Sequence, residues 1–583
     1  MKLDLPLKYI CLPFIFILLA YISSAQMPTI SSFSPASGPV GTLVTITGTN
    51  LLAPNSFTIG GTPAITISNN GTSLVGLVMP GANTGTVVIT TSGGTATSSS
   101  SFSITPTGHP ATQQGNKLVG TGNSGSSIQG SSVAISADGN TAIIGGQADN
   151  SSIGAAWVFT RSGGTWNQQG TKLVGTGYTG TNISQGSSVG ISADGNTAIV
   201  GGNGDNNGIG AAWVFSRTGN TWTQQGSKLV GTGYIGSTIS QGTSVALSAD
   251  GSTAILGGFA DNNYVGASWI FARSGSTWSQ QGSKLVGTGY TGTNIYQGYS
   301  VAMSADGNTA AAGAYLDGSS LGAVWVFTRN GNTWSQQGSK LVCTGNTGSP
   351  VYMGYAIALS ADGNTAIAGG YFDNVSQATG AAWVFTRSGG NWSQQGNKLV
   401  GSGFTVSSEQ GHSVGLSADG NTAVIGGYGD DSHTGAIWVF TRNGSNWSQQ
   451  GGKLVGTGSS GSPSLGWSLA LSADGNTALA GGETDNGSIG AAWVFVPATT
   501  GVLSTTRGID GLSVLPVPSN GDLAITCTNT SMNGQLACFL NMQGSVVYQF
   551  TLRDKQHINI STWPAGVYFL HLSNGAAMKI VKD

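Results

Sequence analysis

Short segments with alternating apolar and polar residues recur along most of the chain. The first group comprises four such segments, Ser132–Ser136 (SVAIS), Thr141–Gly146 (TAIIGG), Ala155–Arg161 (AAWVFTR) and Thr165–Val174 (TWNQQGTKLV). Alternation with a period of two predicts half-buried β-strands. Between the first two segments stands Asp138-Gly139, a pair typical of tight hairpin turns that need a positive φ. The group therefore predicts one antiparallel four-stranded sheet.

The same group of segments recurs seven times. The motif SADG returns with its aspartate at Asp138, Asp194, Asp250, Asp306, Asp362, Asp419 and Asp474. A period of about 56 residues indicates a repeat architecture, and four strands per repeat predict a seven-bladed β-propeller over residues 107–496. The last copy lacks the strand TW-QQG-KLV, and an isolated copy of that strand begins at Thr112. We expect it to complete the last blade and close the ring, which a linear solenoid would not require.

The repeat resembles a known family. Its consensus QG-SVA-SADGNTA-GG…GAAWVFTR is similar to the FG-GAP repeats of integrin-type propellers and of many bacterial surface proteins, from Thr112 to Phe495. Two departures stand out. Gln replaces the Phe of the family motif, as in Gln129-Gly130, and the acidic calcium loop D-x-D-x-D-G is absent. Tryptophans recurring once per repeat, such as Trp157 and Trp213, are interpreted as packing between sheets.

Residues 27–105 contain no Asp, Glu, Lys or Arg. The stretch SFSPASGPVGTLVTITGTNL resembles the start of an IPT/TIG domain, with Pro35, Gly38, Gly41 and Gly48 at the matching positions. The resemblance implies an immunoglobulin-like β-sandwich, which agrees with the alternation in TLVTITG and TVVITTSGG. Nothing in this region predicts catalysis.

The chain ends in a second flanking domain. A Pro/Thr/Gly-rich linker covers residues 497–511, and residues 512–583 resemble the C-terminal sorting domain of the type IX secretion system. The matching positions are Pro516, Pro518, Gly521, Gly566 and Tyr568, whereas Val517 departs from the family's P-N-P turn. The resemblance implies a small β-sandwich, the secretion machinery as a partner and an extracellular or outer-surface location. The alternative is a small interaction sandwich.

Residues 1–25 have the features of a secretory signal peptide, with Lys2 and Lys8 before an apolar run and small residues before Gln26. The apolar run is short for a membrane anchor, so we expect export through the periplasm and no membrane span afterwards. Cys527 is in phase with Leu523, and Cys538 is in phase with Leu536 and Leu540. Both cysteines are expected to face one core, and a disulfide and two buried thiols stay open as alternatives.

Charge patterning argues against several function classes. Only 7% of the residues are charged and the net charge is −2, so we expect no positively charged surface that could bind nucleic acid. Glu409 and Glu483 are the only glutamates, and they lie in different blades and loop types. The histidines show no metal-ligand spacing. We therefore predict no enzymatic activity and no cofactor; a propeller-fold glycosidase or lyase is the alternative.

Candidate binding residues concentrate on one face of the predicted propeller. The loops between strands 2 and 3, and those between blades, are longer and more variable than the hairpins on the other face. They carry the predicted ligand-binding residues Tyr178, Tyr234, Tyr290, Tyr315, Tyr371, Phe372, Tyr428, Asp430, Asp431 and Trp467. The sequence thus predicts a secreted or cell-surface binding or adhesion protein whose ligand is a glycan or a protein.

A second aspartate recurs in each loop between strands 2 and 3, from Asp149 to Asp485. Calcium would need several acids in one loop, and most of these loops offer one carboxylate. We expect an Asx-turn, in which the carboxylate accepts N–H groups of its own loop. Asp430 and Asp431 are the weak candidates for a metal.

Overall fold

The computed structural model describes residues 26–498, 512–515, 522–529, 532–541, 545–564, 566–573 and 577–582. The predicted signal peptide, residues 499–511 of the predicted linker, and Pro516, Pro518 and Gly521 lie outside these residues. The chain divides into two compact units, the first ending at Pro497 and the second beginning at Ala498. Both units are built almost entirely of β-strands, as predicted.

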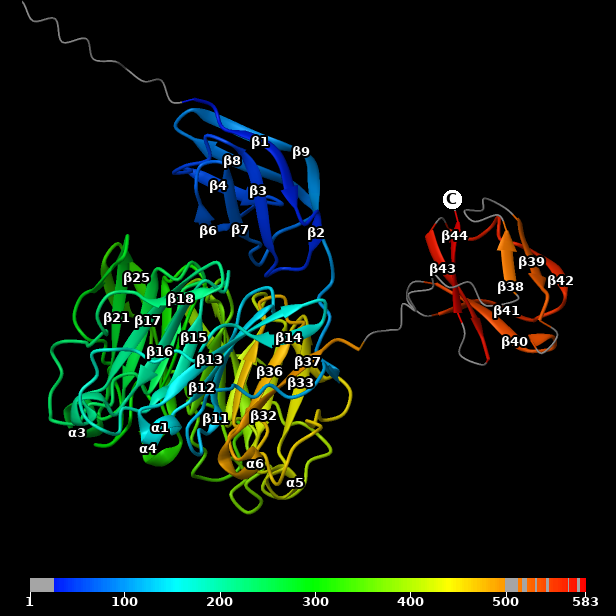
Figure 1. Cartoon of the computed structure of the whole chain (residues 1–583). Coiled ribbons are helices and arrows are strands. Elements are labelled where there is room, and N and C mark those ends of the chain that lie inside the picture. Colours follow the sequence, from blue (N-terminus) through cyan, green and yellow to red (C-terminus); the bar gives the residue numbers. More distant parts are fainter. Residues whose placement is uncertain are drawn as a thin grey trace, which may run out of the picture. The chain divides into compact units, whose positions relative to one another are not determined.

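The first unit begins with two sheets packed as a sandwich (Figure 1). One sheet has the order β1 (Thr29–Ser34), β3 (Leu43–Thr49), β7 (Ser73–Leu77) and β6 (Ile65–Asn69). The other has the order β2 (Ser37–Gly38), β9 (Gly94–Ile104), β8 (Gly85–Thr91), β4 (Ser56–Ile59) and β5 (Thr62–Pro63). The inward residues of the alternating pattern, among them Val44, Ile46 and Phe102, form the core between the sheets.

Seven four-stranded antiparallel sheets follow, which we number in chain order. Sheet 1 contains β11 (Gln129–Ile135), β12 (Thr141–Gly146), β13 (Ala155–Ser162) and β14 (Thr165–Gln168); sheet 2 contains β15 (Gln185–Ile191), β16 (Thr197–Gly202), β17 (Ala211–Thr218) and β18 (Thr221–Gln224). Sheet 3 contains β19 (Ser244–Leu247), β20 (Thr253–Gly258), β21 (Ala267–Ser274) and β22 (Thr277–Gln280); sheet 4 contains β23 (Ser300–Met303), β24 (Thr309–Ala314), β25 (Ala323–Asn330) and β26 (Thr333–Gln336).

The remaining sheets keep this plan with one exception. Sheet 5 contains β27 (Ala356–Leu359), β28 (Thr365–Gly370), β29 (Ala381–Ser388) and β30 (Asn391–Gln394); sheet 6 contains β31 (Ser413–Leu416), β32 (Thr422–Gly427), β33 (Ala436–Asn443) and β34 (Asn446–Gln449). Sheet 7 has the order β10 (Thr112–Gln113), β37 (Ala491–Val496), β36 (Ala478–Gly482) and β35 (Ser468–Leu471). Its outer strand is therefore the N-terminal segment, and the predicted pairing of that segment with the last repeat is confirmed.

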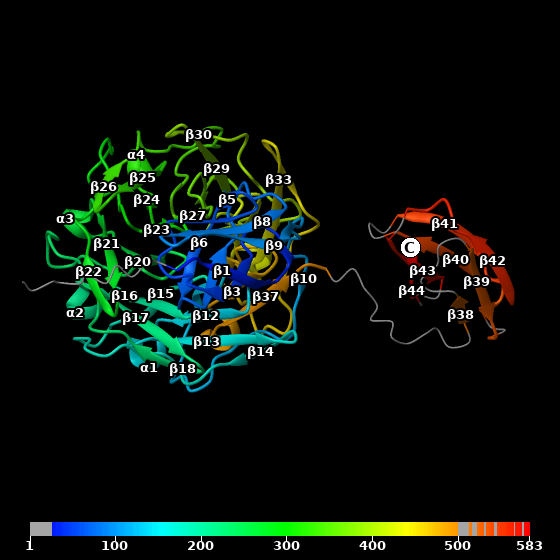
Figure 2. The same cartoon turned by 90° about the horizontal axis from the view of Figure 1, so that it is seen from above.

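The seven sheets form a closed ring, which we call the sheet ring. Each first strand contacts the first strand of the next sheet, and β35 contacts β11 (Figure 2). Gly145 shows why the repeated glycines are needed, because a Cβ there would lie 2.1 Å from the carbonyl oxygen of Gly186 in the next sheet. The once-per-repeat tryptophans of the third strands, such as Trp157 and Trp213, are fully buried between sheets, as predicted.

A circle of backbone hydrogen bonds closes the sheet ring at the SADG turns. The alanine of each SADG donates its N–H to the carbonyl of the alanine in the next repeat. The donors are, in order, Ala137, Ala193, Ala249, Ala305, Ala361, Ala418 and Ala473, and the last donates back to Ala137, with N···O distances of 2.8–3.1 Å. The recurrence of SADG therefore has a structural cause. We call this feature the alanine circle.

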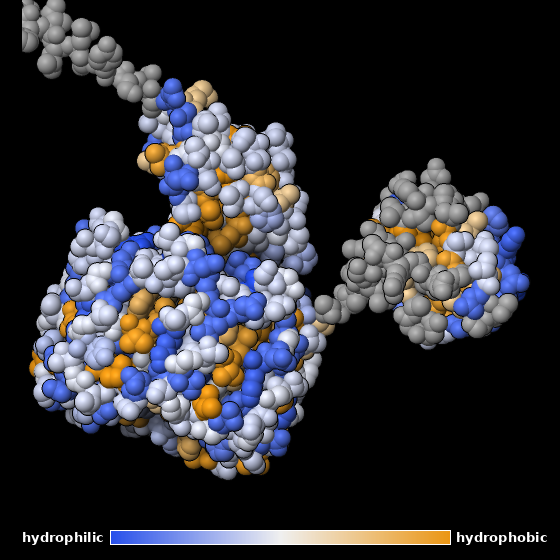
Figure 3. Space-filling model, viewed as in Figure 1, coloured by the Kyte–Doolittle hydropathy of each residue, from blue (hydrophilic) through white to orange (hydrophobic). Residues whose placement is uncertain are grey.

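The N-terminal sandwich packs on the alanine circle. Ile67, Leu77 and Met79 are buried in one cluster with the alanines, and this apolar boundary is visible in Figure 3. Gly41 lies so close that a Cβ on it would be 2.4 Å from the backbone of Ala473. Below the circle, the first strands line an apolar cavity of about 230 Å³ to which Leu77 also contributes. The end of the sheet ring with the SADG turns is thus covered by the sandwich.

The loops between strands 2 and 3 lie at the opposite end of each strand pair. They contain the short turns α1 (Asp149–Ser152), α2 (Asp205–Gly208), α3 (Asp261–Tyr264), α4 (Asp317–Ser320), α5 (Asp430–His433) and α6 (Asp485–Ser488), several of which are labelled together at one end of the sheet ring in Figure 1. Their second residue has a positive φ, 49° at Asn150 for example. Asn, Gly and Asp tolerate this conformation best, which explains their presence after the recurring aspartate.

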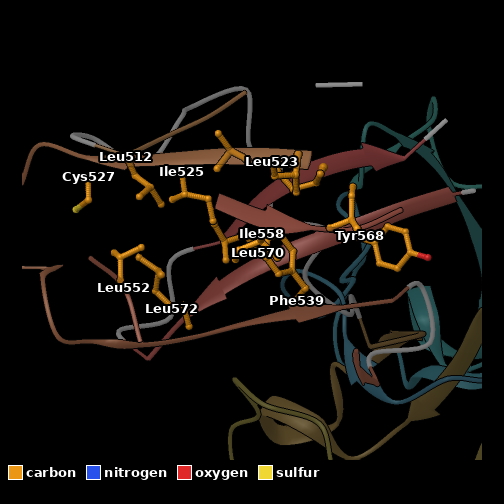
Figure 4. Close-up of a cluster of buried hydrophobic side chains, with 14 of the residues drawn as sticks. Leu512, Leu523, Ile525, Cys527, Phe539, Leu552, Ile558, Tyr568, Leu570 and Leu572 are labelled. Carbon is orange, nitrogen blue, oxygen red and sulfur yellow. The ribbon is translucent and has the colours of Figure 1, made fainter. Parts of the chain in front are cut away.

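The second unit is a small two-sheet sandwich. One sheet has the order β38 (Leu512–Leu515), β39 (Asp522–Cys527) and β42 (Lys555–Asn559), and the other has the order β41 (Val546–Thr551), β40 (Leu536–Leu540), β43 (Gly566–Leu572) and β44 (Ala577–Lys582). Leu523, Phe539, Ile558 and Leu570 meet in its core (Figure 4). Gly566 begins β43, and the Tyr568 hydroxyl donates to the carbonyl of Pro564 at 2.7 Å.

The expectation for Cys538 is wrong. Cys527 belongs to the core of the second unit, but the core residues of β40 are Ala537 and Phe539, so Cys538 lies on the other face of that strand. The adjacent Leu536, which was taken to mark the buried phase, is 51% exposed. Both cysteines are free thiols.

Candidate functional site

Two positions per repeat define the end of the sheet ring opposite the alanine circle, which we call the mouth. One residue follows the recurring glycine at the start of the first strand, which is the Gly of QG in five sheets; the other directly follows the second strand, which ends in GG in six sheets. Because these strands are antiparallel neighbours, both positions lie at the same end of each sheet. The first strands line the axial cavity, so these residues surround the axis at the end away from the alanine circle.

Aromatic residues occupy these positions in five consecutive sheets. The set, which we call the aromatic arc, comprises Phe259, Tyr299, Tyr315, Tyr355, Tyr371, His412, Tyr428 and Trp467. It is continuous, with ring-centroid distances of 5.8 Å for Phe259–Tyr299, 4.9 Å for Tyr299–Tyr355 and 4.8 Å for Tyr355–His412. His412 then lies 4.5 Å from Trp467. The arc therefore runs from sheet 3 to sheet 7 as one packed aromatic surface.

The rest of the mouth is polar and small. The equivalent positions carry Ser131 and Gln147 in sheet 1, Ser187 and Asn203 in sheet 2, and Thr243 in sheet 3. The second position of sheet 7 carries Glu483. The mouth thus combines an aromatic side with a hydrogen-bonding side, although the scaffold beneath repeats almost exactly once per sheet.

Two glutamates meet at the sheet 6 and sheet 7 end of the arc. Burial raises the pKa of Tyr428, and the nearby carboxylates of Glu409 and Glu483 raise it further. Burial also raises the pKa of Glu409, and Oε2 of Glu409 is buried without a hydrogen-bond partner. Burial raises the pKa of Glu483 to about 7. The chain's only two glutamates, 74 positions apart, therefore act on one tyrosine.

His412 is neutral at physiological pH. Burial lowers its pKa to about 4, against the opposing effect of its hydrogen bond to Trp467. Nδ1 of His412 lies 2.9 Å from the carbonyl oxygen of Trp467, which can only accept, so Nδ1 carries the proton. Nε2 is then an acceptor, and it has no hydrogen-bond partner within the described part of the chain.

The structure divides the predicted ligand-binding residues into three groups. Tyr315, Tyr371, Tyr428 and Trp467 belong to the aromatic arc, and Phe372 contacts Tyr352 and Tyr371 at its rim. Tyr178, Tyr234 and Tyr290 lie apart from the arc, in loops that connect successive sheets, and are 38–41% exposed. The third group is the pair Asp430 and Asp431, of which Asp430 is fully buried and Asp431 is exposed.

Sequence reasoning missed four arc residues, namely Phe259, Tyr299, Tyr355 and His412. Their signal was positional rather than chemical. Each follows a glycine that is fixed by the close approach of adjacent sheets, and the residue after this glycine is the one that changes between repeats. An alignment of the seven copies against each other at these two columns would have found the arc.

The recurring aspartates of the strand 2–3 loops have a structural role different from the expected one. Asp149 accepts the N–H of Ser124, 25 residues earlier in the preceding loop, and lies 2.5 Å from the Lys172 ammonium. The same pairing with a lysine occurs in every sheet, and the aspartates are at most 2% exposed. The expected Asx-turn is therefore wrong, because the carboxylate joins its loop to another loop and to the KLV segment that follows the fourth strand. Asp430 takes part in this pattern through Lys453.

Cys343 also has a structural context that the sequence did not suggest. In five of the other six sheets a glycine at its position exchanges two hydrogen bonds with the glutamine of QG, as Gly120 does with Gln129; in sheet 7 Leu465 replaces the glutamine. In sheet 5 both partners differ, since Cys343 replaces the glycine and Met353 the glutamine, and both are buried in one apolar cluster. Burial raises the pKa of the Cys343 thiol to about 11. Within the described residues, no group of three or more His, Cys, Asp or Glu side chains could hold a metal ion.

Comparison with known families assigns the two flanking domains. Residues 28–107 match the IPT/TIG domain, and residues 513–583 match the secretion system C-terminal sorting domain. No curated protein matches the chain. Among solved structures, hydrazine synthase of Kuenenia stuttgartiensis is 14% identical over 64% of this chain and 96% of that one, with a TM-score of 0.40. An auxiliary nutrient binding protein of Bacteroides thetaiotaomicron is 11% identical over 80% of this chain and 97% of that one, with a TM-score of 0.34. At these scores neither likeness supports an argument.

The chain is thus an all-β protein with repeated four-stranded sheets between an IPT/TIG domain and a type IX secretion sorting domain. The sorting domain implies handling by the type IX secretion system, and with it export and a cell-surface or extracellular location. Across the described residues, no helix has the length and hydrophobicity to cross a membrane.

Proposed function

We propose that the sheet ring is a seven-bladed β-propeller of FG-GAP-like repeats and that the protein is a non-catalytic binding or adhesion protein. Its ligand is a glycan, bound at the aromatic arc. The sorting domain supports an extracellular site of action, where polysaccharides are available. The packing of the IPT/TIG domain on the alanine circle leaves the opposite mouth as the accessible one.

The observation that carries the proposal is the unequal mouth. Seven nearly identical repeats have no packing reason to place aromatic residues at the mouth in five sheets and small polar residues in the other two. Aromatic faces stack on the apolar faces of sugar rings, and neighbouring polar groups hydrogen-bond their hydroxyls. A protein partner is the alternative ligand, and it would be expected to use the exposed outer tyrosines as well.

Glycan binding can be tested with matched tyrosine variants. We expect Tyr371→Ala to weaken binding of a soluble polysaccharide by roughly tenfold, because one stacked aromatic contributes about 1 kcal/mol or more. Tyr178→Ala, which removes a tyrosine 39% exposed outside the arc, should leave the affinity unchanged. Isothermal titration against a panel of polysaccharides measures both. Equal losses for the two variants would contradict an arc-centred site.

A specific observation favours a second candidate, a carbohydrate-active enzyme. Glu409 and Glu483 both act on Tyr428, and carboxyl groups with raised pKa values are the usual general acids of glycoside hydrolysis. Release of new reducing ends from a bound polysaccharide, lost in both Glu409→Gln and Glu483→Gln, would establish this activity. We favour binding because the arc extends over five sheets, far beyond the two carboxyl groups.

Export is the third part of the proposal. Residues 1–25 serve as the signal peptide, and the sorting domain then directs the protein across the outer membrane. Deletion of Leu512–Asp583 should leave the sheet ring folded and retain it in the periplasm of the host. Surface labelling of intact cells measures this, and undiminished display of the truncated protein would refute the assignment.

A further inference from the structure

The acids of the sheet ring are neutralised in two regular ways. Each strand 2–3 aspartate pairs with a lysine, and each SADG aspartate accepts from its own turn, as Asp138 does from Ser136 and Asn140. The arginine at the end of the third strand lies near the SADG turns: burial lowers the pKa of Arg161 and the charge of Asp138 opposes that shift, while Nε of Arg161 donates to Asn140 of the same turn at 2.9 Å. The repeat therefore supplies each of its own acids with donors or a cation.

Glu409 and Glu483 do not follow these patterns. Neither has a Lys or Arg partner within the described part of the chain. Burial raises the pKa of Glu409, and the neighbouring Tyr428 and His433 oppose that rise. Burial also raises the pKa of Tyr371, and Glu409 adds to that rise. Glu483 occupies the position in sheet 7 that Tyr428 occupies in sheet 6, directly after the second strand. Two carboxyl groups thus stand half-buried at the mouth without a lysine or arginine counter-ion among the described residues.

The free hydrogen-bonding capacity at this end of the arc is acceptor capacity. Oε2 of Glu409 has no donor, and Nε2 of His412 is a free acceptor on a side chain only 7% exposed. The surrounding walls are the rings of Tyr371, Tyr428 and Trp467. Aromatic faces attract cations, and unpaired carboxylates bind N–H donors that carry a positive charge. An anionic sugar would be repelled here, and a neutral one would leave the carboxyl groups unpaired.

We propose that the end of the aromatic arc between sheets 6 and 7 recognises an ammonium group on the ligand, so that the glycan is an amino sugar polymer with free amines. Glu409 and Glu483 act as its counter-ions, Nε2 of His412 accepts one of its N–H groups, and Tyr428 and Trp467 contact it through their ring faces. The inference rests on the glycan-binding function proposed above and names the class of glycan.

Binding of an ammonium group beside Glu483 should release a proton, and this release can be measured. Burial keeps Glu483 largely protonated below pH 7 in the free protein. A bound ammonium favours the carboxylate, so a proton leaves Glu483 when the ligand binds at pH 6. Proton release detected by titration calorimetry in buffers of different ionisation enthalpy therefore reports on the contact directly.

The experiment uses the mature full-length protein and two trimers of equal length, glucosamine and N-acetylglucosamine, at pH 6. We expect the glucosamine trimer to bind at least about tenfold more tightly than the N-acetylglucosamine trimer, and its binding to release a proton from Glu483. Glu483→Gln should abolish both the preference and the proton release, and Glu409→Gln should reduce the preference. Asp431→Asn is the matched control, because it removes an exposed acid from the same side of the mouth and should change neither.

Each outcome decides the inference. Equal binding of the two trimers, or a preference that survives Glu483→Gln, overturns the ammonium site while leaving glycan binding intact. Binding of other polysaccharides but of neither trimer also overturns it and keeps the arc as a glycan site. If no glycan binds at all, both the ammonium site and the proposed glycan-binding function are refuted. Tyr428→Phe provides a second variant, because it removes only the hydroxyl beside Glu409. It should weaken binding of the glucosamine trimer more than binding of the N-acetylglucosamine trimer.

Discussion

Removal of Lys453 tests whether the seven aspartate–lysine pairs hold the sheet ring together. Asp430 is fully buried, its Oδ1 accepts the N–H of Thr405 at 2.7 Å, and its Oδ2 accepts from Lys453. Lys453→Met keeps most of the side-chain volume but leaves the carboxylate buried without a cation. Such a loss costs about 3–5 kcal/mol, and we expect about 3 kcal/mol because the lysine is 22% exposed and water can approach.

The assay is urea unfolding followed by tryptophan emission. Every tryptophan except Trp563 lies between Trp157 and Trp493, so the signal reports on the sheet ring. The double variant Asp430→Asn with Lys453→Met removes both charges and should recover most of the loss, since the asparagine oxygen can still accept from Thr405. Asp431→Asn, next to the pair but exposed, should change the free energy of unfolding by less than about 0.5 kcal/mol. A loss below about 1 kcal/mol in Lys453→Met, or no recovery in the double variant, would refute the reasoning.

Three further predictions concern closure, calcium and pH. Gln114→Ala should cost about 1–2 kcal/mol, measured by the same unfolding assay, because Oε1 of Gln114 accepts from Arg161 and Trp166 across the junction of sheets 7 and 1; no change would mean that this junction does not limit stability. Chelator should not shift the melting temperature, because the recurring aspartates are already occupied by lysines; a shift reversed by calcium would contradict this. Folding raises the pKa of Glu483. The protonated carboxyl group therefore contributes stability at pH values below the pKa of Glu483 in the unfolded chain, and this contribution is lost as the pH rises to about 7. Glu483→Gln should thus have the same melting temperature as the parent protein at pH 4 and a higher one at pH 8. Equal melting temperatures of the two proteins at pH 8 would contradict the buried, unpaired state of the Glu483 carboxyl group.

Much of the architecture could be predicted because it follows local rules. Alternation, glycines in tight turns and a constant period predicted the strands. The isolated strand that begins at Thr112 predicted how the last sheet is completed. The phase of Cys538 was misjudged because β40 has apolar residues on both faces, so alternation alone could not identify the buried one. The family resemblances of the two flanking domains were confirmed by the matched models.

The site depended on relations that a linear reading hides. Glu409 and Glu483 lie in different types of loop, but both loops are at the mouth end of neighbouring sheets, and both carboxylates add to the burial that raises the pKa of Tyr428. The aspartate–lysine pairs were readable in principle, because each residue occurs once per repeat. Cys343 and Met353 were likewise a coupled change in one repeat. Comparison between repeats of one chain would have supplied these pairings.

The alanine circle also limits how this gene can change. Each alanine bonds only to its neighbours on either side, so gaining or losing one repeat would require every bond to adopt a new angle around a circle of different size. Length changes are instead absorbed in the loops: the spacing from Ala361 to Ala418 is one residue longer, and that from Ala418 to Ala473 one shorter, than the usual 56, yet both bonds keep ordinary lengths of 2.9 and 2.8 Å. Duplication of repeats is therefore a poor route to new binding properties in this protein. Point substitutions at the mouth leave the circle untouched, and diversification among its descendants should be concentrated there.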